Sequence, residues 1–115
     1  MLKQEFEKTK ASVIKTSPER DMIVSHETNE ISFTLDQPLL KEFYGFGPVY
    51  KQKELFPEYS DEDNNFIYSE DERTITITNV SLLPNKSYRI KLVGNMTCTQ
   101  EGNTSSNYEL VFKTN

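Results

Sequence analysis

Apolar and polar residues alternate along several short segments of this chain, and turn residues separate the segments. In residues 30–36, Ile31, Phe33 and Leu35 fall on one parity, and the residues between them are polar. A period of two is typical of a β-strand that has one face in a core and the other in water. Residues 73–78, 87–93 and 108–113 repeat this pattern. Their spacing along the chain predicts an all-β sandwich or barrel.

Shorter apolar segments at residues 12–15, 22–24 and 66–68 raise the expected total to about seven or eight strands, which is the number in a sandwich domain. The chain contains a single alanine, Ala11, although alanine is the best helix former. No segment has a sustained helical period. The alternation predicts one shared core made of Ile31, Phe33, Leu35, Ile75, Ile77, Ile90, Leu92, Leu110 and Phe112.

The 115 residues are enough for one domain with a two-layer core that needs neither a metal nor a disulfide. Residues 1–10 are polar and charge-rich, so we expect a lead-in or linker there and the domain itself at residues 11–115. No apolar run has the length of a membrane-spanning helix, and the first residues lack the apolar core of a signal peptide. The chain is therefore expected to be either cytosolic or an excised domain of an exported protein.

The net charge of −5 argues against nucleic acid as a partner, because nucleic-acid-binding proteins usually present a basic face. No basic amphipathic stretch is present for insertion into an anionic membrane surface. The sole histidine, His26, lies in a polar turn, and the sole cysteine, Cys98, has no histidine near it in sequence. Because no nucleophile and base come together and no phosphate-binding fingerprint occurs, we expect no catalytic residues, no cofactor and no enzymatic activity.

The acidic loop at residues 58–65 supplies many oxygen ligands of the kind that calcium prefers. It lacks the central glycine and the distal glutamate of an EF-hand loop, so a solvated loop is the default interpretation and no metal ligand is assigned. Whether the loop binds calcium is left open by the sequence.

The middle of the chain is rich in aromatic residues, and Tyr44, Phe46 and Tyr50 share one parity. On a strand they would form a stripe, because residues two apart point to the same side. One interpretation places these rings in the core, where they would replace the missing tryptophan. The other is an exposed platform for a sugar or protein ligand, with Tyr44, Phe46 and Tyr50 as the ligand-binding candidates.

Leu82, Pro84 and Tyr88 form a Leu-x-Pro-x-x-x-Tyr pattern directly before an alternating segment. A tyrosine at this place can form a tyrosine corner, in which the ring packs under the core and the hydroxyl bonds to the backbone upstream. A chance proline turn before a strand is the alternative.

Several segments, in their order along the chain, resemble bacterial Ig-like domains of surface proteins, which are related in shape to fibronectin type III domains. They are residues 13–18 ending in Ser-Pro, residues 31–39, residues 74–77 followed by 83–88, the Gly102-Asn103 turn, and residues 110–114 at the end. The resemblance spans residues 12–114 and implies an immunoglobulin-like or fibronectin type III-like sandwich of two antiparallel sheets. Residues 41–71 depart from the family pattern, being longer, more acidic and more aromatic.

The resemblance implies a non-enzymatic module of a bacterial secreted or cell-surface protein, located outside the cell or in its envelope. Such a module would act as a structural spacer or in adhesion, with neighbouring domains or a protein or glycan ligand as partners. One alternative is a carbohydrate- or peptide-binding module that uses the aromatic residues of the 43–68 segment. Another is a small secreted inhibitor whose wedge would be the Gly45–Pro48 segment.

Overall fold

The structure is a computed structural model that describes residues 10–49, 53–60 and 65–115. Every strand except the one at Phe46–Gly47 coincides with an apolar or alternating segment of the sequence. In chain order the elements are β1 (Val13–Ser17), β2 (Ile23–Val24), β3 (Ile31–Leu35), β4 (Phe46–Gly47), β5 (Phe66–Tyr68), β6 (Thr74–Ile77), β7 (Ser87–Leu92), the short 3-10 helix η3 (Gly94–Met96) and β8 (Tyr108–Thr114).

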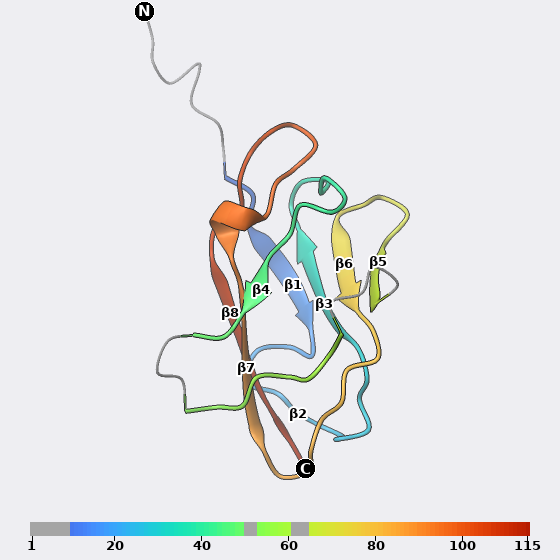
Figure 1. The fold of residues 1–115 in the computed structure, drawn as a ribbon, viewed down its shortest axis with the longest axis vertical. Helices are drawn as coiled ribbons and strands as arrows, with labels where there is room; N and C mark the ends of the chain where they lie inside the picture. Colours follow the sequence, from blue (N-terminus) through green and yellow to red (C-terminus); the bar gives the residue numbers. More distant parts are fainter. Residues whose placement is uncertain (1–9, 50–52, 61–64) are drawn as a thin grey trace, which may run out of the picture.

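The strands form two four-stranded sheets, with the orders β1-β3-β6-β5 and β2-β8-β7-β4, which pack face to face (Figure 1). This confirms the predicted all-β, Ig-like sandwich. One pairing differs from the expected antiparallel arrangement, because β2 lies parallel to β8. The chain passes from β1 to β2 by changing sheets without reversing its direction, so β2 runs the same way as β8.

The core lies between the two sheets and contains all nine residues that the alternation predicted, each with 0% of its surface exposed. Buried and half-buried residues alternate along β3, β6 and β7, as a strand with one face in the core requires. Phe33 and Phe112 are the largest fully buried side chains, one from each sheet. The predicted core is therefore confirmed.

The segment that departs from the family pattern covers the outer edge of β7 in two places. Phe46 and Gly47 of β4 pair with Leu92 and Lys91. The chain then returns to the same edge, where the Leu55 N–H donates to the Ser87 carbonyl and the Leu55 carbonyl accepts from the Arg89 N–H. The edge of β7 is thus protected from pairing with another chain.

No helix in the described part of the chain is long and apolar enough to cross a membrane.

Candidate functional site

The Tyr88 hydroxyl bonds to the backbone upstream of it. Its oxygen accepts a 2.6 Å hydrogen bond from the Leu83 N–H, and the residue is only 2% exposed. The ring stacks on Phe112 with centroids 5.6 Å apart. Leu82 is buried beside it, whereas Pro84 is exposed on the turn. This arrangement joins the crossing segment to the core and offers no chemistry of its own.

The three aromatic residues that the sequence singled out are not equally placed. Phe46 lies in β4 opposite the buried Leu92, and its ring centroid is 5.1 Å from that of Phe33. Tyr44 precedes the strand and packs 4.6 Å from Phe66. Both rings are half-buried against the core. Tyr50 lies outside the described residues.

Tyr44 also lines a cavity of about 360 Å³ beside the edge strand β5. The residues around this cavity, called the aromatic pocket below, are Lys41, Glu42, Tyr44, Phe66 and Tyr68. The Glu42 N–H donates a 3.1 Å hydrogen bond to the Tyr68 hydroxyl, and the Lys41 ammonium lies 5.8 Å from the centre of the Tyr68 ring. Burial raises the pKa of the Tyr68 hydroxyl. Rings beside one cation and one carboxylate could hold a sugar or a short peptide.

Phe66 and Tyr68 belong to the aromatic 43–68 segment but are not among the three ligand-binding candidates that the sequence singled out. Their shared parity within residues 66–68 was the available signal, but only the fold brings them beside Tyr44.

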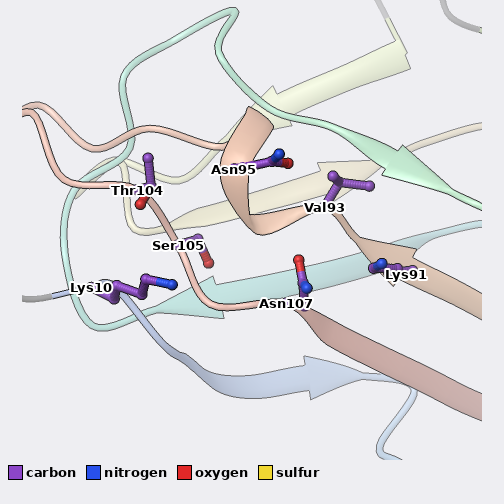
Figure 2. A pocket seen from close by; sticks show the side chains of 7 residues that line it. All are labelled: Lys10, Lys91, Val93, Asn95, Thr104, Ser105 and Asn107. Atoms are coloured by element: carbon purple, nitrogen blue, oxygen red, sulfur yellow. The ribbon is translucent and has the colours of Figure 1, made fainter.

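A second cavity, of about 410 Å³, lies at the end of the sandwich that carries η3 (Figure 2). This cavity, called the lysine pocket below, is lined by Lys10, Lys91, Val93, Asn95, Thr104, Ser105 and Asn107. Lys10 belongs to the stretch expected to be a lead-in, and no pattern in the sequence places it at a pocket. Its neighbour Ala11 is fully buried, and the Ala11 N–H donates to the Thr104 carbonyl at 2.9 Å.

The segment considered as an inhibitor wedge does not protrude as a loop. Gly45 is buried, and Phe46–Gly47 are paired with β7. A side chain at Gly45 would also collide with that of Met96, whose Cβ would lie 2.8 Å away.

The histidine and the cysteine lie in separate parts of the described structure. His26 is exposed in the turn after β2, and Cys98 is half-buried beyond η3. Within the described ranges, no three residues among His, Cys, Asp and Glu come together as metal ligands would. Residues 61–64 of the acidic loop lie outside these ranges, so the calcium hypothesis is not addressed by the structure.

The two packed sheets and their strand order define an Ig-like β-sandwich. No protein-family profile and no curated protein matches the sequence. Among solved structures, the chain is similar to CopC from Methylosinus trichosporium OB3b, with a TM-score of 0.64, 11% identity, and 91% of this chain and 93% of that chain covered. PcoC, a methionine-rich copper resistance protein from Escherichia coli, gives a TM-score of 0.63 and 12% identity over 93% of this chain and all of that chain.

The chain is also similar to the N-terminal part of the bacterial S-layer protein SbsC. The TM-score is 0.57 and the identity 16%, and the match covers 93% of this chain but 24% of that one. At these identities the comparisons establish a shared fold. They support the predicted resemblance at the level of a β-sandwich that also occurs in bacterial proteins.

Proposed function

We propose that this chain is a non-enzymatic Ig-like module of an exported bacterial protein, in which it spaces neighbouring domains or takes part in adhesion. The observation that carries this proposal is the likeness to the S-layer protein SbsC. Nearly the whole chain matches about a quarter of the SbsC fragment. A match to one part of a longer surface protein supports the proposal that this chain is one such module.

The path of the chain supports a role as a spacer. The chain enters the sandwich at the end that carries η3, where Ala11 bridges to Ser105, and β8 leads to Asn115 at the opposite end (Figure 1). A domain entered at one end and left at the other extends an array by its full length.

A sugar- or peptide-binding role is the second candidate, and the aromatic pocket favours it. Tyr44 and Tyr68 are half-buried there, and Lys41 and Glu42 supply polar contacts at the rim. Screening glycans and peptides against the protein and a Tyr68→Ala variant tests this role. A ligand whose binding is lost in the variant would support it, and the absence of any ligand would leave the spacer as the function.

Copper is the third possibility, because PcoC, which matches over its whole length, is a copper resistance protein. Among the described residues, the sulfur and imidazole ligands are divided between the two ends of the sandwich. Met22 and His26 flank β2 at one end, while Met96 and Cys98 lie in and beyond η3 at the other (Figure 1). Thioether, thiolate and imidazole groups bind copper when they converge on one ion.

Urea unfolding with and without Cu(I) or Cu(II) tests whether the chain is a spacer or adhesion module or a copper-binding protein. A ligand that binds only the folded state raises stability with its concentration. We expect an unchanged unfolding midpoint at every copper concentration. A midpoint that rises with copper and saturates would contradict the proposal and favour copper binding.

A further inference from the structure

The lysine pocket is lined by two lysines from distant parts of the chain. Lys91 is half-buried in β7, and Lys10 is exposed just before β1. Figure 2 shows both side chains pointing into the pocket from opposite sides. None of the seven lining residues is acidic, although the chain as a whole carries a net charge of −5. Two cations at one pocket make its local charge positive, which favours an anion over a cation as the ligand.

The acidic residue closest to Lys91 in the sheet register is engaged elsewhere. Glu109 of β8 is paired opposite Lys91, but its carboxylate accepts a 2.6 Å hydrogen bond from the Arg89 guanidinium. The negative charge of Glu109 is therefore paired with Arg89 and not with a lysine of the pocket. The two lysines of the pocket have no ion pair among the described residues.

Asn107 adds a donor between the two lysines. Its Oδ1 accepts a 2.7 Å hydrogen bond from the Gly94 N–H, which fixes the orientation of the amide. The Nδ2 group, which carries only donors, is left for a ligand. Figure 2 shows the Asn107 side chain between Lys10 and Lys91. Two ammonium groups and one amide nitrogen are all donors, which is what the oxygens of an anion require.

The backbone around the pocket is held by hydrogen bonds between segments. The Ala11 N–H donates to the Thr104 carbonyl at 2.9 Å, and the Ser106 N–H donates to the Ala11 carbonyl at 2.8 Å. These bonds fix the chain beside Lys10 against the segment that carries Asn107. The Ser105 N–H donates to the Gly94 and Thr97 carbonyls, which joins the same segment to η3. The backbone that carries Lys10 and Asn107 is thus fixed before a ligand arrives, which lowers the entropy lost on binding.

We propose that the lysine pocket binds a small oxyanion, either free phosphate or the carboxylate of an acidic sugar. Lys10, Lys91 and the Asn107 amide nitrogen supply the contacts. This site goes beyond the proposed function and does not depend on it, because an anion site could occur in a spacer or in an adhesion domain.

NMR titration of the full chain tests the site, with inorganic phosphate in one arm and glucuronate, against glucose, in the other. Total ionic strength is held constant with sodium chloride. We expect saturable shifts of the Gly94, Ser105 and Asn107 amides with at least one of the two anions and none with glucose. If only phosphate gives saturable shifts, the ligand of the pocket is a free oxyanion. If glucuronate gives them, the ligand is an acidic sugar. The absence of saturable shifts with both anions would overturn the site.

The variant for this test replaces both lysines of the pocket, Lys10→Gln and Lys91→Gln. Its matched control replaces Lys86→Gln and Lys113→Gln, which changes the net charge equally at exposed positions. Affinity should fall at least about tenfold in the pocket variant, the factor associated with losing a hydrogen bond to a charged group. It should stay within about twofold in the control, because salt screens distant charges. Equal losses in both variants would show nonspecific attraction and contradict the proposal.

Discussion

The Arg89 guanidinium in β7 donates a 2.8 Å hydrogen bond to the Glu54 carboxylate, which lies 35 positions earlier in the chain. The same guanidinium donates to Glu109 of β8 at 2.6 Å. Arg89 and Glu54 are mostly shielded, with side chains 25% and 22% exposed. Together with the backbone pairing of Leu55, this ion pair holds residues 53–56 against the sandwich.

Stability should decrease at acid pH, in part through this pair. The hydrogen bond from Arg89 lowers the pKa of the Glu54 carboxyl below its usual value of 4.5. Because the folded-state pKa is the lower one, the contribution is fully present above about pH 4.5 and is lost as the pH falls through the folded-state pKa. Glu54→Gln should therefore show a smaller loss of stability between pH 7 and pH 3 than the unchanged protein does.

Urea unfolding at the two pH values measures this effect. Glu27→Gln is the control, because Glu27 is exposed in the turn after β2 and no ion pair involving it occurs among the described residues. If the stabilities of Glu54→Gln and Glu27→Gln change equally with pH, the pair between Arg89 and Glu54 contributes nothing measurable to the pH dependence of stability.

Removing the Tyr88 hydroxyl should destabilise the domain by about 1 kcal/mol, the net contribution of one hydrogen bond. Tyr88→Phe keeps the ring against Phe112 but leaves the Leu83 N–H without its 2.6 Å acceptor. The midpoint of urea unfolding reports the change. Tyr108→Phe is the control, since no hydrogen bond to the Tyr108 hydroxyl is seen in the described structure. An unchanged midpoint for Tyr88→Phe would mean that the hydroxyl has no role in stability.

Gly94 should not tolerate even a methyl group. A Cβ at this position would collide with the Ser105 carbonyl oxygen and lie 2.9 Å from the backbone nitrogen of Asn107. Gly94→Ala should therefore destabilise the domain by about 1–3 kcal/mol, as overpacking of a close contact usually does. Gly47→Ala is the matched control, because nothing lies within 4 Å of a Cβ there. Thermal unfolding measures the difference. If both variants unfold at the same temperature, the contact around Gly94 relaxes without destabilising the domain.

The sequence predicted the parts of the fold that follow from local alternation. Ile31, Phe33 and Leu35 share a parity, and that parity alone places them in the core. The parallel pairing of β2 with β8 was not predicted, because β2 has only two residues and is too short to show an alternation of apolar and polar residues.

The pockets depend on contacts between distant segments, so the sequence could not predict them. Lys10 and Lys91 line the same pocket because Ala11 pairs with the chain before β8. Tyr44 packs against Phe66 because β4 and β5 are the edge strands of the two packed sheets. Local sequence patterns carry no information on tertiary contacts between distant segments.

Antibody labelling of intact cells of the source organism tests most directly whether this domain belongs to an exported protein. Antibodies against residues 11–115 should label intact cells, or cells from which only the outer envelope has been removed. External protease should abolish that labelling while a cytosolic marker stays intact. Labelling that appears only after the cytoplasmic membrane is permeabilised would contradict the proposed role as a module of an exported protein.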